Sequence, residues 1–158
     1  MNAYRLKPLK YPWPPLLYGV AIVAALLLDR YVGLLPPLPR EGYLLWTLGG
    51  VLALVALSLD IWAVKTLLEC HTAVLPNRCA QRLVTNGPFR FTRNPIYLGY
   101  TLMTIAFGLL TGNSWFFVAA VTAAVVTTLV AIRCEEMHLL ARFGIEFERY
   151  CQRTRRWI

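Results

Sequence analysis

The residues best able to do chemistry lie in two polar stretches of an otherwise apolar chain. The first, residues 81–99, has the sequence QRLVTNGPFRFTRNPIYLG, and the second, residues 133–136, is RCEE. In the first stretch, Arg90 and Arg93 can each offer paired N–H donors to a carboxylate or phosphate. Aromatic faces for a ring or a cation come from Phe89, Phe91 and Tyr97. This composition predicts a ligand-binding loop, and a juxtamembrane loop that contacts lipid headgroups is the alternative.

The second stretch places two carboxylates side by side at Glu135 and Glu136. Successive residues on a helix point about 100° apart, so one glutamate can face the protein interior while the other faces the arginine-rich loop. A carboxylate at the mouth of a membrane cavity can bind an ammonium group. The alternative is a structural Arg–Glu pair that joins loop and helix.

The elements that must position these residues are membrane-spanning helices. The 158 residues are 58% hydrophobic and only 15% charged, and average globular chains are about 45–50% apolar and about 25% charged. Mean hydropathy is +0.52. We therefore expect an all-α integral membrane protein with one membrane domain and about four spans, near residues 14–35, 43–68, 95–110 and 115–132.

A tight turn at residues 111–114 (TGNS) makes the last two spans a helical hairpin. The hairpin brings a cofactor loop, residues 70–94, next to an amphipathic C-terminal helical segment, residues 133–152, in which Gly144 is a helix stop. The tail RTRRW, residues 153–157, is predicted to anchor at the lipid surface. Asp60, inside the second span, has two open interpretations: it faces the cofactor cavity, or it snorkels to the interface or pairs locally.

Charge distribution predicts the topology of the chain. With four spans, 14 of the 16 basic residues fall on the face that holds both termini and the 70–94 loop. The positive-inside rule places that face in the cytosol. The net charge of +8 then reflects topology and anionic lipid, and nucleic acid is not an expected partner.

The four cysteines predict neither a disulfide nor a metal site. Their spacing matches no zinc or redox motif, and thiols on the cytosolic face stay reduced. Oligomeric state is not indicated, although Gly49-Gly50 permits close helix contact. The cysteines are Cys70, Cys79, Cys134 and Cys151.

Residues 83–99 fit the pattern LVxxGPFRxxRNPxYxG, and they are followed by Glu135-Glu136 and by FGxxFxxY at residues 143–150. This ordered set resembles the isoprenylcysteine carboxyl methyltransferase and phospholipid methyltransferase superfamily. The resemblance covers roughly half of the chain, and the N-terminal half is similar only in its apolar spans. It implies an integral membrane enzyme that uses S-adenosylmethionine in a cytosol-facing pocket without a Rossmann domain.

The resemblance also implies roles for individual residues. Glu135 would bind the α-ammonium group of the cofactor, while Tyr97 and Asn94 would lie beside its methionine part and sulfonium. Arg133 is a weaker candidate for orienting the substrate, and Glu136 joins Asn94, Tyr97 and Arg133 as a candidate catalytic residue. The full set of expected cofactor-binding residues is Gln81, Arg82, Leu83, Val84, Gly87, Phe89, Arg93, Asn94, Pro95, Ile96, Tyr97 and Glu135.

One position departs from the family pattern, because many relatives have histidine where this chain has Asn94. Asparagine keeps a hydrogen-bonding side chain but cannot act as a base near neutral pH. We expect the change to be tolerated, because methyl transfer from a sulfonium needs mainly an in-line approach and the exclusion of water.

The expected function is methyl transfer from S-adenosylmethionine to a lipophilic or membrane-associated acceptor. An isoprenylcysteine-type carboxylate, a phospholipid amine and a small thiol all remain open as acceptors, and S-adenosylhomocysteine would be the other product. The alternative is a non-enzymatic transporter or assembly protein with the same fold. Charges that cluster at one face, and two uncharged spans, argue against a polar path across the bilayer.

Overall fold

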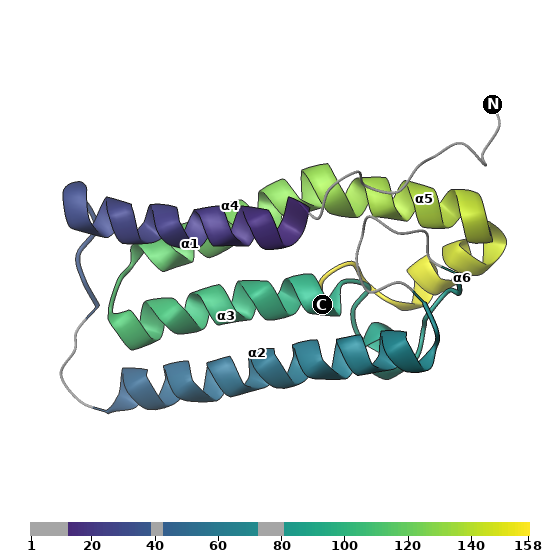
Figure 1. The fold of residues 1–158 in the computed structure, drawn as a ribbon, viewed down its shortest axis with the longest axis horizontal. Helices are drawn as coiled ribbons and strands as arrows, with labels where there is room; N and C mark the ends of the chain where they lie inside the picture. The colour runs from purple at the N-terminus through teal and green to yellow at the C-terminus, as the bar shows by residue number, and fades with distance from the viewer. Residues whose placement is uncertain (1–12, 39–42, 73–80) are drawn as a thin grey trace.

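The computed structural model describes residues 13–38, 43–72 and 81–158, and this part of the chain is mostly helical (Figure 1). Extended pairing within it is limited to an isolated parallel bridge between Thr92 and Arg155. The all-α expectation is therefore confirmed. Part of the predicted cofactor loop, residues 73–80 with Cys79, lies outside the described residues.

Three helices in the described part are long and apolar enough to cross a membrane. They are α1 (Trp13–Tyr31), α2 (Leu44–Glu69) and the continuous helix Trp115–Phe143. A fourth apolar helix, α3 (Pro95–Thr111), has 17 residues and measures about 25 Å at about 1.5 Å per residue. Together these four apolar helices form a bundle whose composition is compatible with an integral membrane protein.

The first span is shorter than predicted. Helix α1 ends at Tyr31, whereas the apolar run had suggested residue 35. The carbonyl of Leu28 accepts hydrogen bonds from the N–H groups of Val32 and Gly33, and Gly33 then takes a left-handed φ of 52°. Prolines at positions 36 and 37 cannot continue the helix, so the apolar residues after Tyr31 belong to the connection.

Helix α3 is the centre of the bundle. It lies between α2 on one side and the layer of α1 and α4 (Trp115–Thr127) on the other (Figure 1). Helices in lipid have no hydrophobic driving force to associate and depend on van der Waals packing instead, and glycines allow the close approach that such packing needs. Gly49 on α2 packs against Leu110, and Gly108 on α3 packs against Phe116.

The predicted hairpin between α3 and α4 is confirmed. Gly112 ends α3 with a left-handed φ of 70°. Asn113 then caps the next helix, because its side-chain oxygen accepts a hydrogen bond from the N–H of Trp115 at 2.8 Å. The side-chain amide of Asn113 donates to the carbonyl of Ala25 at 3.2 Å. This turn is thereby fixed to α1.

The last span continues without a break into the polar part of the chain. A π-helical turn, Thr128–Ile132, joins α4 to α5 (Arg133–Phe143). The resulting helix has 29 residues, about 43 Å at about 1.5 Å per residue, and exceeds the roughly 30 Å hydrocarbon core. The continuous helix Trp115–Phe143 is therefore longer than a bilayer core requires, and α5 is its polar end.

Gly144 ends α5, as predicted, with a positive φ of 53°. The chain does not stop there but starts a second helix, α6 (Ile145–Arg153). The predicted single segment 133–152 is thus two helices, because only glycine adopts this backbone turn readily. Helix α6 is amphipathic, with Phe147 and Tyr150 buried and its acidic and basic residues exposed.

Candidate functional site

A short hydrogen bond joins the first turn of α3 to the first turn of α5. The phenol of Tyr97 donates to Oε1 of Glu135 at 2.5 Å, and the Tyr97 side chain is buried. On the other side of Tyr97, the hydroxyl of Tyr18 on α1 donates to its backbone carbonyl at 3.4 Å. Because the α3–α4 hairpin folds back on itself, the two polar stretches meet, as their positions in the sequence predicted.

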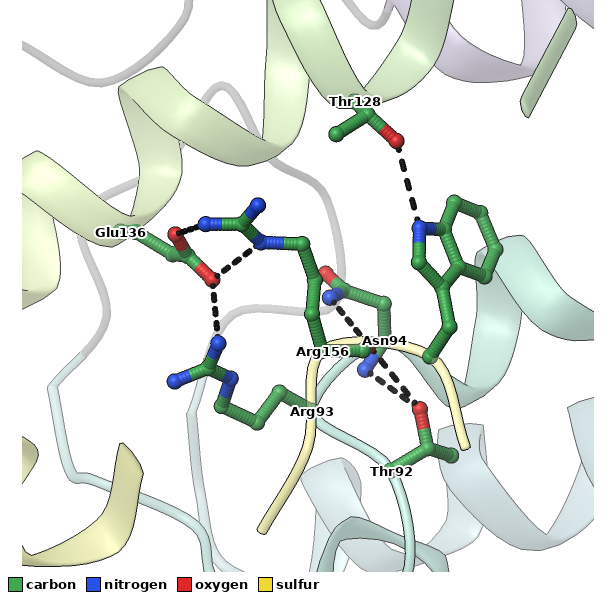
Figure 2. A network of polar contacts seen from close by, with 7 residues as sticks. Thr92, Arg93, Asn94, Thr128, Glu136 and Arg156 are labelled. Carbon is green, nitrogen blue, oxygen red and sulfur yellow. Dashed lines mark hydrogen bonds and ion pairs between the residues drawn. The ribbon is translucent and has the colours of Figure 1, made fainter. Parts of the chain in front are cut away.

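Glu136 faces the other way and binds two arginines (Figure 2). Its Oε1 lies 3.1 Å from Nη2 of Arg93. Arg156 donates to both carboxylate oxygens, from Nε at 3.0 Å and from Nη2 at 2.5 Å. This confirms that one glutamate faces the hairpin and the other the arginine-rich loop. The Arg–Glu pair between loop and helix, predicted as an alternative, is present at Glu136.

The loop before α3 is shaped by a short 3₁₀ turn, η2 (Gly87–Arg90). Gly87 has a φ of 57°, and a Cβ at this position would lie only 2.6 Å from Oγ1 of Thr66 on α2. Glycine is therefore required twice, for the backbone angle and for the close approach to α2. Further along, the ring of Phe91 packs against Trp62 with centroids 6.4 Å apart.

The expected adenosine-contacting residues begin beside the end of α2. The backbone N–H of Gln81 donates to Oγ1 of Thr72 at 3.0 Å, and Arg82 makes a similar contact at 3.5 Å. The side chains of both residues are exposed, Leu83 is half-buried and Val84 is buried. The start of the loop is thus held through its backbone, which leaves the polar side chains free to reach a ligand.

The chain's last residues return to this loop and lie alongside it. We call residues 154–157 the C-terminal segment. The amide of Asn94 donates to the carbonyl of Arg156 at 2.9 Å, and Thr92 donates to the same carbonyl at 3.2 Å (Figure 2). The N–H of Arg93 donates to the carbonyl of Arg155 at 3.0 Å. The segment predicted as a lipid-surface anchor thus binds the loop through its backbone carbonyls, while the side chains of Arg153 and Arg155 are exposed.

Helix α6 supports the same loop from a second point. The phenol of Tyr150 donates to the carbonyl of Phe89 at 2.6 Å. Burial raises the pKa of Tyr150, so the phenol keeps its proton and remains a donor. The loop therefore receives hydrogen bonds from α6 and from the C-terminal segment.

The structure brings some predicted residues together and separates others. Tyr97 and Glu135 form one pair, while Arg93 and Glu136 belong to the cluster with Arg156. Arg133 is exposed on α5, and the described residues give it no ion pair. Three further residues lie at the loop–α3 junction, with Asn94 and Pro95 buried and Ile96 half-buried.

Asp60 lies in the contact between α2 and α3. Gly99 makes room for its carboxylate, because a Cβ at position 99 would overlap the Asp60 carboxyl group. Its Oδ1 is buried and has no hydrogen-bond partner among the described residues. The carboxylate therefore packs directly over the backbone of α3, two residues from Tyr97.

The donor set fits a cofactor that carries one ammonium and one carboxylate. Glu135 offers a carboxylate for the ammonium, and Arg93 has a buried Nε without a hydrogen-bond partner in the described chain. Within the described residues, no group of three His, Cys, Asp or Glu side chains is arranged to hold a metal ion. Cys70, Cys134 and Cys151 are free thiols.

Sequence reasoning missed several residues of this site. They act through backbone carbonyls or single hydroxyls, and a sequence carries little signal for such contacts. Arg156 could have been found from the sequence, because two adjacent glutamates near the arginine-rich tail suggest that one of them pairs with an arginine there. The missed residues are Thr92, Thr128, Thr154, Arg156 and Trp157.

The phospholipid methyltransferase family profile matches residues 44–146, which include α2, α3, α4, α5 and the loop before α3. The chain belongs to this family of membrane methyltransferases.

A shorter match is to a protein of Haemophilus influenzae whose only description is "uncharacterized protein". It is 35% identical over 63 residues, which are 40% of this chain and 100% of that relative. No solved structure matches the chain significantly.

Proposed function

We propose that this protein transfers a methyl group from S-adenosylmethionine to a lipophilic or membrane-associated acceptor. The observation that carries the proposal is the Tyr97–Glu135 hydrogen bond of 2.5 Å, at the point where the loop, α3 and α5 meet. It holds a carboxylate in a buried place at the end of an apolar bundle. Family membership supports the same reaction class.

Bound S-adenosylmethionine supplies an electrophilic methyl group on a sulfonium ion. Glu135 binds the α-ammonium group of the methionine part, and Tyr97 fixes the direction of that carboxylate. Arg93 supplies a donor for an anionic group through its free Nε. The remaining contacts come from Gln81, Arg82, Leu83, Val84, Gly87, Phe89, Asn94, Pro95 and Ile96.

The protein contributes mainly orientation and the exclusion of water. Positioning two reactants for an in-line approach removes much of the entropic barrier of a bimolecular reaction. The apolar bundle around Tyr97 provides a dry surrounding, in which a dispersing positive charge is not held back by a hydration shell. Asn94 needs no basic role in this scheme, because its amide is engaged with the carbonyl of Arg156.

The acceptor enters from the bilayer and the cofactor from the cytosol. The sequence supports this orientation, because the four-span topology assigns 14 of the 16 basic residues to the face predicted to be cytosolic. A phospholipid amine is the acceptor class that the family description favours, and an isoprenylcysteine-type carboxylate is the competitor. An amine must lose a proton before attack, whereas a carboxylate needs no base.

The test is calorimetric titration of S-adenosylhomocysteine into the detergent-purified protein and its Glu135→Ala variant. Hydrogen bonds to charged groups contribute about 1.5–3 kcal/mol, so we expect binding to weaken about tenfold or more. Glu148→Ala, which removes an exposed carboxylate on α6, is the matched control and should bind like wild type. Unchanged affinity in Glu135→Ala contradicts the site, and absence of binding by folded wild type favours a non-enzymatic membrane protein.

A further inference from the structure

The C-terminal segment joins the two parts of the chain that build the site. It lies along residues 90–94, where Thr154 donates to the carbonyl of Arg90 at 3.3 Å and the Arg155 and Arg156 carbonyls accept from the loop. Its other contacts go to the last span. Trp157 donates from Nε1 to Oγ1 of Thr128 at 3.3 Å (Figure 2).

Arg156 makes contacts in both directions. Its carbonyl accepts hydrogen bonds from the side chains of Asn94 and Thr92, while its guanidinium binds both oxygens of Glu136. This paired geometry is the strongest form of Arg–carboxylate contact. The hydrogen bond to Glu136 also raises the pKa of Arg156, so the cation keeps its charge.

Glu136 has too many partners to act as a free carboxylate. It accepts hydrogen bonds from Arg156 on both oxygens and forms an ion pair with Arg93 through one of them, and its side chain is 19% exposed. A side chain held at two points fixes the rotation of its helix. Because Glu135 is the preceding residue, about 100° around α5, the same contacts set the direction in which Glu135 faces Tyr97.

We propose that Arg156, together with Glu136, is a positioning residue that orients Glu135 for cofactor binding without itself touching the cofactor. The inference rests on the proposed function. It changes the expectation for Glu136, which the sequence had suggested as a catalytic residue. It also gives Asn94 a structural role. The Asn94 amide binds the backbone carbonyl of Arg156, and the Arg156 side chain in turn binds Glu136.

The experiment measures S-adenosylhomocysteine affinity by calorimetry for wild type, Arg156→Ala, Arg156→Lys and Arg149→Ala. A hydrogen bond to a charged group is worth about 1.5 kcal/mol or more, so we expect Arg156→Ala to weaken S-adenosylhomocysteine affinity about tenfold. Arg156→Lys keeps the charge but cannot make the paired hydrogen bonds of a guanidinium to a carboxylate, so we expect intermediate affinity. Arg149 is exposed on α6, and Arg149→Ala is the control that should match wild type.

A second measurement separates positioning from simple folding defects. The unfolding temperature without ligand is recorded for each variant, and affinity is compared below the lowest of these temperatures. Glu136→Gln, which keeps shape but weakens both arginine contacts, should lower affinity in the same direction as Arg156→Ala. If Arg156→Ala fails to fold, Arg156→Lys and Glu136→Gln carry the test.

The outcomes are distinguishable. If wild type, both Arg156 variants and Glu136→Gln all bind S-adenosylhomocysteine with equal affinity, the positioning role is overturned and the proposed function is left intact. Wild type that does not bind overturns the proposed function, and the positioning role with it. Graded loss in the order wild type, Arg156→Lys, Arg156→Ala supports the inference.

Discussion

The membrane-spanning helices and the polar end of the molecule are held together by different kinds of interaction. Where α3 packs against α2 on one side and α4 on the other, glycines allow close approach, as at Gly49, Gly99 and Gly108. Around residues 89–97, the contacts are hydrogen bonds and ion pairs that cross from loop to α5, α6 and the C-terminal segment. Substitutions that add atoms should therefore destabilise the helix contacts, and substitutions that remove polar atoms should destabilise the polar end.

The largest effect is expected at Gly99. In Gly99→Ala, the new methyl group overlaps the Asp60 carboxyl group, and overpacking of this kind costs about 3 kcal/mol at its upper usual range. Thermal unfolding in detergent measures the change. The control is Gly50→Ala on α2, where nothing lies within 4 Å of the new atom.

A double variant sharpens the same test. Asp60→Ala removes the group that the Gly99→Ala methyl meets, so the combination should recover most of the lost stability. If Gly99→Ala and Gly50→Ala unfold at the same temperature, close packing of α2 on α3 is not what limits this region.

A smaller loss is expected when Tyr97 is changed to phenylalanine. The variant keeps the ring but removes the 2.5 Å hydrogen bond to Glu135, at a cost of about 2 kcal/mol for a bond to a charged group. Unfolding temperature is the measurement, and Tyr31→Phe, at a residue 81% exposed, should change nothing. Equal behaviour of the two variants would mean that the polar contact contributes no stability.

The smallest effect is expected at Tyr150. Tyr150→Phe removes the hydrogen bond to the Phe89 carbonyl, a neutral bond worth about 1 kcal/mol. Because burial raises the pKa of Tyr150 in the folded protein, this contribution is complete below about pH 10, the usual tyrosine pKa. It is lost as pH rises further. The stability difference between wild type and variant should therefore shrink in strongly alkaline buffer, and a difference that grows with pH would contradict the assignment.

Much of the fold could be predicted from the sequence because it depends on long patterns. Apolar runs set the spans, residues 111–114 set the hairpin, and the hairpin requires residues near Tyr97 and Glu135 to meet. The different directions of Glu135 and Glu136, about 100° apart around the helix, follow from helical geometry. These predictions hold because each one rests on many residues or on a fixed helical angle.

The contacts of the C-terminal segment could not be predicted in the same way. Arg155 and Arg156 accept hydrogen bonds through their backbone carbonyls, and every residue type offers that acceptor. An arginine-rich segment next to a membrane is also typical of lipid binding. Composition therefore favoured lipid, and only three-dimensional structure shows that Glu136 binds one of these arginines.

The π turn at Thr128–Ile132 bears on how one-residue insertions and deletions can occur in this span among relatives. A π turn holds one residue more than the same stretch of regular helix and is a single-residue insertion in geometric terms. The N–H of Arg133 reaches back to the carbonyl of Thr128, five residues earlier, so the extra residue is absorbed before α5 begins. Relatives one residue shorter in this span are therefore expected to have an unbroken α-helix there and to keep the glutamate pair in the same orientation. An alignment of this segment should show a one-residue gap between the two kinds of relative.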